Sequence, residues 1–324
     1  MRRRNLLAIL LSAAGCGRRR AQSEPIRVGV GPYLTMSGVY LAWERAYFQD
    51  VDLEVELVHE AGSAQAIPLL SAGKLDVAFF ASNPSFVNAA AKGAFLRVVA
   101  GREQIAPDCK DGIALHYRKP AFPEGLSDLR LLRGKRISIS RKASVTEFLL
   151  DTLLEHAGLS GSDIHVVQLG QPEAVAALVS GSIDGVVTSQ LWNAPALVSR
   201  EVGRCDAFAR VMPYLQYSYV FYGRRLLEGE ISTGVRFLAA YLRAAREFAV
   251  GATPKFMEEF ARKNRLDPKV VQETCRKSFA ADGRIDLPSL ERFLRWTVDK
   301  DYCPASVQAE QLVDGRFLER QATV

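Results

Sequence analysis

Short apolar runs alternate with stretches of helical periodicity from residue 26 onward. Residues 26–30, 53–58 and 77–80 are mainly apolar and have the length of strands, and the segments between them carry apolar positions three or four residues apart. Continuous apolar strands are typical of parallel sheets that are buried on both faces. The alternation predicts a β-α-β-α-β unit and therefore an α/β fold.

The same order of elements returns in the middle of the chain. Residues 136–140, 164–169 and 185–187 have strand patterns, and a helix is expected over residues 144–158. The helix begins with Ser-Val-Thr-Glu, which has the form of a capping box. The middle of the chain therefore predicts a second β-α-β-α-β unit.

A short motif marks the repeat. Residues 70–76 (LSAGKLD) are echoed by residues 178–184 (LVSGSID). In both copies a glycine ends a helix and an aspartate leads into a strand. The repeat predicts two similar lobes, each built with right-handed crossovers.

The predicted fold class is α/β, with two similar parallel-type lobes around a ligand cleft. We expect the first lobe to comprise residues 25–112 and 222–324, and the second lobe to comprise residues 113–221. Linkers are expected at residues 111–122, which contain two prolines, and at residues 214–224, whose alternating pattern is that of a strand returning to the first lobe.

Helical patterns dominate the last third of the chain. Thr253-Pro254 and Asp267-Pro268 have the form of an N-cap followed by proline at the first helical position. We expect these helices to pack on the first lobe and on the face between the lobes. Their predicted ranges are 231–250, 253–263, 268–279 and 287–298.

The first residues have the pattern of an export segment. A basic start precedes a short apolar run, which ends in Ala-Ala-Gly-Cys at residues 13–16. We expect residues 1–15 to be a lipoprotein-type signal peptide, Cys16 to be lipidated, and residues 16–24 to form a tether. The ending resembles a lipobox, although Ala13 stands where leucine is more usual. The alternative is an apolar N-terminal helix that buries Cys16.

The export route stays open at the level of sequence. Arg3-Arg4-Asn5-Leu6-Leu7 resembles a twin-arginine signal. An ordinary basic n-region that contains paired arginines is the alternative, and it would use the general secretory route.

The charge balance argues against a nucleic-acid-binding protein. The 324 residues are 48% hydrophobic and 24% charged, and the formal net charge is +6, of which Arg2, Arg3 and Arg4 supply three. Beyond residue 20, basic residues interleave with acidic ones rather than forming blocks. No apolar run of about 18 residues is present, so no membrane-spanning helix is expected in the mature chain.

Four cysteines remain if Cys16 is lipidated. They are Cys109, Cys205, Cys275 and Cys303. An even number in an exported protein allows disulfides, and four cysteines allow three connectivities, among which the sequence does not choose. No Cys-x-x-Cys pair or Cys/His cluster occurs, so no metal site is expected.

The chain carries no motif of a P-loop, a serine hydrolase or a zinc protease. Its four histidines, His59, His116, His156 and His165, are scattered, and none adjoins a nucleophile in the sequence. We therefore expect a binding protein without a cofactor rather than an enzyme.

Ligands of open α/β sheets bind beyond the carboxyl ends of the strands, so the polar residues at those ends are the binding candidates. In the first lobe they are Pro32, Tyr33, Thr35, Ser63, Ser82 and Asn83. In the second lobe they are Arg141, Ser144, Thr146, Thr188 and Gln190.

Some of these candidates suggest the chemistry of the ligand. Ser63 and Ser144 begin helices, whose N-terminal N–H groups attract anions, although simple N-capping explains both serines as well. Arg141 can pair with an anion, or it can be an exposed loop residue beside Lys142. The aromatic side chains that could stack on a ligand are Tyr33, Phe80, Tyr214, Tyr217 and Trp192.

Several segments resemble the nitrate, sulfonate and thiamine-precursor group of type II periplasmic binding proteins. These segments are 62–63, 70–79, 93–100, 133–139 and 181–184. The resemblance implies two lobes that close on a ligand like a Venus flytrap.

The resemblance also implies a role in transport. It implies a monomeric solute-binding protein of an ABC importer, exported to the periplasm or cell surface and anchored to the membrane by lipid. Such a protein would pass a small organic anion or heterocycle to an inner-membrane permease. The alternatives are an extracytoplasmic ligand sensor, or an enzyme similar to yeast thiamine pyrimidine synthase, whose clustered cysteines this chain lacks.

Overall fold

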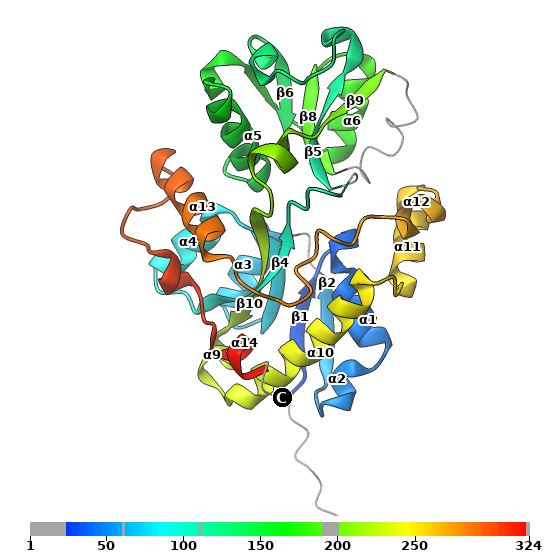
Figure 1. Ribbon diagram of the computed structural model, residues 1–324. Coiled ribbons are helices and arrows are strands. Elements are labelled where there is room, and N and C mark those ends of the chain that lie inside the picture. The colour runs from blue at the N-terminus through cyan, green and yellow to red at the C-terminus, as the bar shows by residue number, and fades with distance from the viewer. Residues whose placement is uncertain (1–23, 60–61, 110–111, 190–200, 322–324) are drawn as a thin grey trace, which may run out of the picture.

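The computed structural model describes residues 24–59, 62–109, 112–189 and 201–321, which form two α/β lobes (Figure 1). The predicted fold class is confirmed. Cys16 and Gln190 lie outside the described residues, so the predicted lipidation site and one candidate ligand residue stay predictions.

The first lobe contains a five-stranded sheet in the order β2-β1-β3-β10-β4. β1 pairs in parallel with β2 and β3, whereas β10 runs antiparallel to β3 and β4. The most apolar runs of this lobe thus lie in the middle of the sheet. The bounds are β1 Ile26–Val30, β2 Val55–His59, β3 Val77–Ala81, β4 Leu96–Gln104 and β10 Gln216–Gly223.

The second lobe follows the same plan, with the strand order β7-β6-β8-β5-β9. β6 pairs in parallel with β7 and β8, and β5 runs antiparallel to β8 and β9. The two predicted β-α-β-α-β units are therefore confirmed. The bounds are β5 Ile113–Arg118, β6 Arg136–Ile139, β7 His165–Gln168, β8 Gly185–Ser189 and β9 Val202–Cys205.

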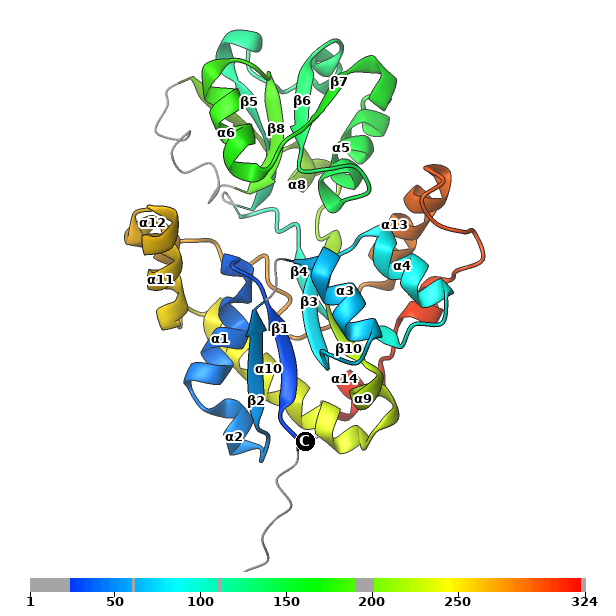
Figure 2. The ribbon, with the colours of Figure 1, turned by 180° about the vertical axis from the view of Figure 1, so that it is seen from behind.

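Helices cover both faces of the first sheet (Figures 1 and 2). Val77 and Phe79 of β3 pack with α10, whereas Ala78 and Phe80 point to the other face and pack with α3. This alternation is the period-two geometry of a strand buried on both sides. The helices of this lobe are α1 Ser37–Glu44, α2 Tyr47–Asp50, α3 Ser63–Ser71, α4 Pro84–Ala91, α9 Arg224–Glu228, α10 Ile231–Ala249, α11 Lys255–Asn264, α12 Pro268–Gln272, α13 Leu287–Asp299 and α14 Arg316–Gln321.

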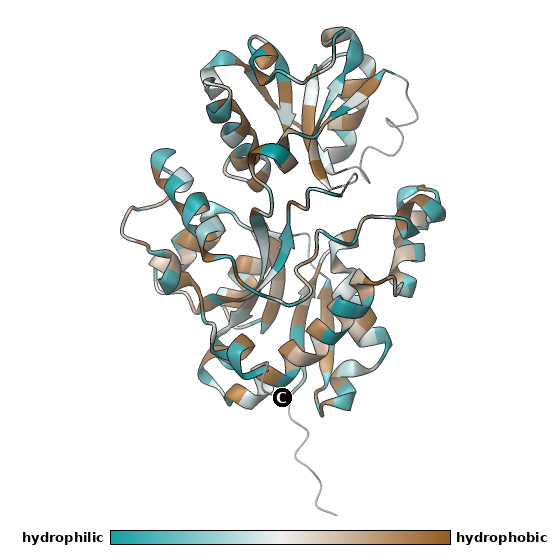
Figure 3. Ribbon diagram, viewed as in Figure 1, coloured by the Kyte–Doolittle hydropathy of each residue, from teal (hydrophilic) through white to brown (hydrophobic). Residues whose placement is uncertain are grey.

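The second lobe carries α5 Val145–His156, α6 Gln171–Ser180 and α8 Ala207–Val211. Hydrophobic residues concentrate on the strands of both sheets, and hydrophilic residues lie mostly on the outer sides of the helices (Figure 3). Within the described part of the chain, no helix is both long and apolar enough to cross a bilayer.

The repeated aspartate has the same structural role in each lobe. Asp76 accepts a hydrogen bond from the backbone N–H of Arg27 at 2.9 Å and pairs with its guanidinium at 3.0 Å. Asp184 does the same with Arg136, at 2.8 Å and 3.1 Å. In both lobes the aspartate therefore ties the entry of the third strand of the unit to the first strand.

The crossings between the lobes are shorter than the sequence predicts. The expected linker at 111–122 is wrong, because Ile113–Arg118 forms β5 between β8 and β9. The expected boundary after residue 221 is also wrong, because β10 begins at Gln216 and belongs to the first sheet. Pairing within a sheet gives buried backbone groups the partners that a linker would not supply.

The two crossings lie side by side. The Tyr214 N–H donates to the Ile105 carbonyl at 2.8 Å, and the Ile105 N–H donates to the Leu215 carbonyl at 3.0 Å. These bonds hold the chain that leaves β4 against the chain that enters β10.

The predicted helix at 268–279 ends early, at Gln272. The chain beyond it follows β4 instead: Gln104 N–H donates to the Ser278 carbonyl at 2.8 Å, and Ala280 N–H donates to the Arg102 carbonyl at 2.7 Å. The N-cap prediction for Asp267 is confirmed, since its carboxylate accepts from the Lys269 N–H.

The matching prediction for Thr253-Pro254 is wrong, because α11 starts at Lys255 and Pro254 occupies the N-cap position. The backbone N–H groups of Lys255 and Phe256 instead donate to the Glu44 carboxylate of α1. The Glu44 carboxylate, from a neighbouring helix, therefore caps the N-terminus of α11 in place of Thr253.

One disulfide joins Cys109 to Cys275, with their Cα atoms 5.6 Å apart. It connects the chain leaving β4 with the segment after α12. Cys205 and Cys303 are buried free thiols, and burial raises the pKa of each.

Candidate functional site

A cleft lies between the two lobes at the carboxyl ends of the parallel strands. It consists of two adjoining cavities of about 310 Å³ and 240 Å³. Both cavities are bordered by Tyr33, Thr35, Glu103, Ser140 and Val145, so they form one continuous space. Because Ser140 and Val145 belong to the second lobe and the other three to the first, both lobes contribute to it.

The larger cavity is the apolar half of the cleft. Aromatic rings from four separate parts of the chain line it, namely Tyr217 of β10, Phe248 of α10, Phe260 of α11 and Phe279 beyond α12. Burial raises the pKa of Tyr217 well above its ordinary value, and the nearby Glu103 carboxylate raises it further. This half therefore suits the hydrocarbon or aromatic body of a ligand.

The smaller cavity is the polar half of the cleft. The N-termini of three helices meet here: α3 at Gly62-Ser63, α4 at Asn83 and α5 at Ser144-Val145. Arg141 also lines it and is exposed. Helix N-termini carry partial positive charge, so three of them with an arginine create a positive region.

The start of α3 is held close to Tyr33. Gly62 has φ +117°, and a Cβ at this position would lie 3.0 Å from the Tyr33 hydroxyl oxygen. Glycine is therefore required both by the backbone conformation and by the approach of the ring. Ser63 is the first residue of the helix, and Gly62 occupies the N-cap.

The loop from Ser140 to Glu147 fixes the start of α5. The Thr146 hydroxyl accepts from the Ser140 N–H at 3.1 Å and lies 2.9 Å from the Ser144 hydroxyl, which donates to the Arg141 carbonyl at 2.6 Å. The Glu147 carboxylate accepts from the Ala143 N–H at 2.6 Å. The predicted capping box is thus wrong in detail. Glu147 bonds the N–H of Ala143 rather than that of the N-cap residue Ser144, and the Ser144 side chain makes no capping hydrogen bond.

The structure brings most of the predicted ligand residues to this cleft. Those that line it are Tyr33, Thr35, Ser63, Ser82, Asn83, Arg141, Ser144, Thr146 and Thr188.

Two of the predicted positions are not placed there. Pro32 is exposed and lines neither cavity, although the next residue, Tyr33, lines both. Gln190 lies outside the described residues. Asn83 also has a structural role, since its side chain caps α4 by accepting from the Ser85 N–H at 3.1 Å.

The aromatic candidates divide in the same way. Tyr33 and Tyr217 border the apolar half and Phe80 borders the polar half. Tyr214 is 61% exposed and lines neither cavity, and Trp192 lies outside the described residues.

Two charged residues in the cleft wall escaped the sequence prediction. Arg102 is 3% exposed and Glu103 is 7% exposed, and they form an ion pair with 3.3 Å between a guanidinium nitrogen and Oε2. The signal was present, since opposite charges directly follow the apolar run of β4. Periodicity alone would place one of these two residues on the outside of the strand.

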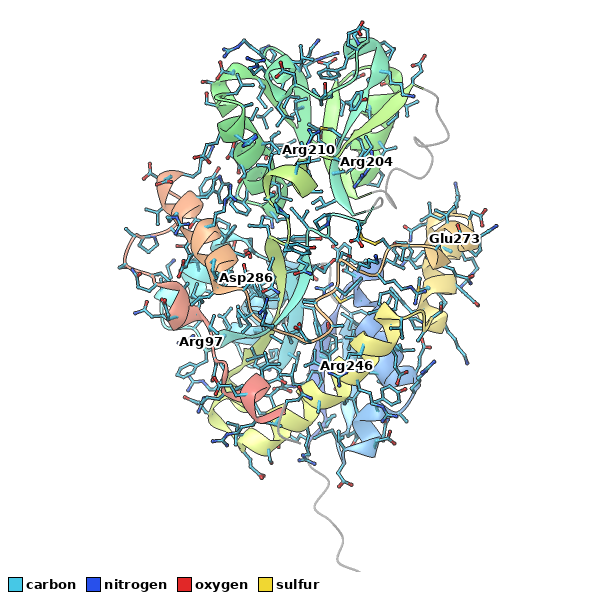
Figure 4. The ribbon with its side chains drawn as sticks, viewed as in Figure 1. Arg97, Arg204, Arg210, Arg246, Glu273 and Asp286 are labelled. Carbon is cyan, nitrogen blue, oxygen red and sulfur yellow. A yellow bond between two sulfur atoms is a disulfide. The ribbon has the colours of Figure 1, made fainter. Side chains whose placement is uncertain are left out.

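Figure 4 shows the side chains of both lobes, with Arg204 and Arg210 labelled on the second lobe and Glu273 and Asp286 on the first. Among the described residues, no group of three or more His, Cys, Asp or Glu side chains is arranged to hold a metal ion.

Comparison with known families gives one match that spans much of the chain. The family model described as "NMT1/THI5 like" matches residues 34–251. An aliphatic sulfonates-binding protein of Bacillus subtilis is 27% identical over 188 residues, which is 55% of this chain and 53% of that protein. A thiamine biosynthesis protein of Haemophilus influenzae is 27% identical over 151 residues, which is 47% of this chain and 45% of that protein. The chain thus spans about half the length of the curated relatives it matches.

Solved structures share the two-lobed fold. The periplasmic aliphatic sulphonate binding protein SsuA of Escherichia coli has a TM-score of 0.71 and 18% identity, covering 90% of this chain and 92% of that one. The nitrate-binding protein NrtA of Synechocystis has a TM-score of 0.68 and 11% identity, covering 93% and 89%. The desulfurization enzyme DSZB, with a TM-score of 0.62 and 14% identity, covers 92% and 99%.

Proposed function

Because the chain belongs to the NMT1/THI5-like family, we propose that it is the extracytoplasmic solute-binding protein of an ABC importer. It captures a small organic anion or anionic heterocycle between its lobes and delivers it to a membrane permease. Aliphatic sulfonate binding by the Bacillus subtilis relative, as its name states, supports this class of ligand.

One observation carries the proposal: the cleft joins an apolar half to a polar half with three helix N-termini and Arg141. A bare nitrate ion would leave the aromatic half of the cleft empty. An organic anion fills both halves, with its charged group near Arg141 and its body among Phe248, Phe260 and Phe279. Contact with both lobes favours the closed state through the ligand's greater affinity for it.

The export segment extends the proposal to location. We place the mature protein, a monomer, in the periplasm or at the cell surface, with Cys16 lipidated and residues 16–24 as the tether. Cys16→Ser should release the protein from membranes in cell fractionation. Membrane association that persists in this variant would remove the lipid anchor from the proposal.

The ligand class can be tested by thermal shift with sulfonates, nitrate, pyrimidines and aromatic acids. A ligand at about 100 times its dissociation constant adds about 2.7 kcal/mol of stability, which raises the melting temperature clearly. Arg141→Ala should weaken the best anionic ligand about tenfold to a hundredfold, because a charge-assisted hydrogen bond is lost. Lys142→Ala is the matched control, since Lys142 lines neither cavity.

Two results would contradict the proposal. Equal loss of affinity in Arg141→Ala and Lys142→Ala would show that the anion does not sit in the polar half. Conversion of the bound compound into a product would point to an enzyme on the same fold, which the DSZB likeness makes worth measuring.

A further inference from the structure

A β-bulge places two consecutive charged side chains on the same wall of the cleft. In the pairing of β4 with β10, Gly101 faces Tyr219 and Glu103 faces Ser218, so Arg102 is the extra residue. Successive residues of a regular strand point to opposite faces, and a bulge re-aims one of them. Arg102 and Glu103 therefore both border the polar half of the cleft, and Glu103 also borders the apolar half.

The Arg102 guanidinium is occupied by partners within the protein. Its guanidinium donates to the Thr35 carbonyl at 2.9 Å and to the Ser218 hydroxyl at 3.2 Å, and it pairs with Glu103 Oε2 at 3.3 Å. It also lies over the Phe79 ring, 5.7 Å from the centroid. Arg102 thus holds Glu103 in place rather than serving as the anion-binding group.

Glu103 has acceptor capacity left over. An ionised carboxylate offers two oxygens with about four lone-pair sites. Among the described residues, the Arg102 guanidinium is the one side-chain partner of Glu103, and it contacts Oε2. Oε1 therefore remains available at the junction of the two halves.

The surroundings strengthen any interaction at this carboxylate. The nearby Tyr241 is buried, and burial raises its pKa to about 12, whereas Tyr217 is partly buried where it lines the apolar half. Charges interact more strongly where water is excluded. A ligand ammonium group at this position would meet a fixed, partly unpaired negative charge.

We propose that Glu103 is a specificity-determining residue that seats a protonated amino group of the ligand. The ligand would then be a zwitterionic organic acid: its acidic group lies in the polar half near Arg141, its amino group lies against Glu103, and its apolar body fills the aromatic half. This inference rests on the proposed function and narrows its ligand class.

The test uses two ligands that differ only in the amino group, 4-(aminomethyl)benzenesulfonate and 4-methylbenzenesulfonate. Calorimetric titration at neutral pH measures both affinities for the wild-type protein, Glu103→Gln and Arg141→Ala. The wild type should bind the aminomethyl compound about tenfold to a hundredfold more tightly, as expected for a charge-assisted hydrogen bond. Glu103→Gln should remove that preference. Arg141→Ala should instead weaken the binding of both compounds and keep the preference for the aminomethyl compound.

Each other outcome overturns a defined part of the account. If the wild-type protein prefers the methyl compound, or binds both equally, Glu103 does not bind the amino group. The cleft would then still be an anion-binding site. An unchanged preference in Glu103→Gln assigns the amino group to another residue. If neither compound binds the wild type, the proposal that the ligand is a sulfonate fails together with the proposed role of Glu103. The wild-type comparison needs no variant, so it holds even if Glu103→Gln folds poorly.

Discussion

A buried histidine should make the stability of the protein depend on pH. His116 of β5 is 0% exposed, and neither ring nitrogen has a hydrogen-bond partner among the described residues. In the sheet it lies opposite Val186 on one side and Arg204 on the other. Burial, with a smaller contribution from the Arg204 charge, lowers the pKa of His116 from 6.5 to about 4.

The sign follows from which state binds more protons. Between pH 6.5 and 4 the unfolded chain protonates this histidine while the folded protein does not, so the free energy of unfolding falls as the pH drops. The contribution is fully present above about pH 6.5 and is lost at about pH 4. Each pH unit is worth about 1.4 kcal/mol, which gives on the order of 3 kcal/mol over the interval.

Urea unfolding followed by far-ultraviolet circular dichroism can measure this effect. The wild type and His116→Leu are compared at about pH 7 and about pH 4.5, so that the carboxylates that titrate in both proteins cancel. The difference in unfolding free energy between them should shift by about 2 kcal/mol in favour of the variant at the lower pH. Parallel stability curves for the two proteins would show that His116 does not remain neutral in the folded state.

Two further predictions concern the frame of the cleft. Reduction of the Cys109–Cys275 disulfide, whose cysteines are 166 residues apart, should lower the free energy of unfolding by about 2–5 kcal/mol. The melting temperature with and without reductant measures this loss. A melting temperature that does not change with reductant, or that changes equally in Cys109→Ser, would contradict the prediction. Asn83→Ala should lower the free energy of unfolding by about 1 kcal/mol, because α4 loses its N-cap hydrogen bond. Urea unfolding of the ligand-free protein measures this change separately from any effect on ligand affinity. An unchanged urea midpoint would mean that the cap does not contribute to stability.

The fold was predictable because its determinants are local. The apolar runs of β1, β3 and β8 and the repeated aspartates Asp76 and Asp184 lie in short segments, and each marks a strand entry in the structure. The polar half of the cleft was predictable for the same reason. Strand ends and helix starts are visible in the sequence, and topology brings them to one edge of the sheet.

The apolar half was not predictable from such segments. Phe248, Phe260 and Phe279 belong to parts of the chain that periodicity marks only as buried, and tertiary packing turns them toward the cleft. The bulge at Arg102 depends on the register between β4 and β10, which are more than a hundred residues apart in the chain. Pairing of Cys109 with Cys275 likewise follows from the packing of the segment after α12 on β4.

The central claim is that one ligand is held between the two lobes. A crystal structure with a compound selected by thermal shift tests it most directly. We predict electron density in the cleft, with the acidic group near Arg141 of the second lobe and the body of the ligand against Tyr33 and Phe248 of the first. A compound bound elsewhere, or in contact with one lobe alone, would contradict the account.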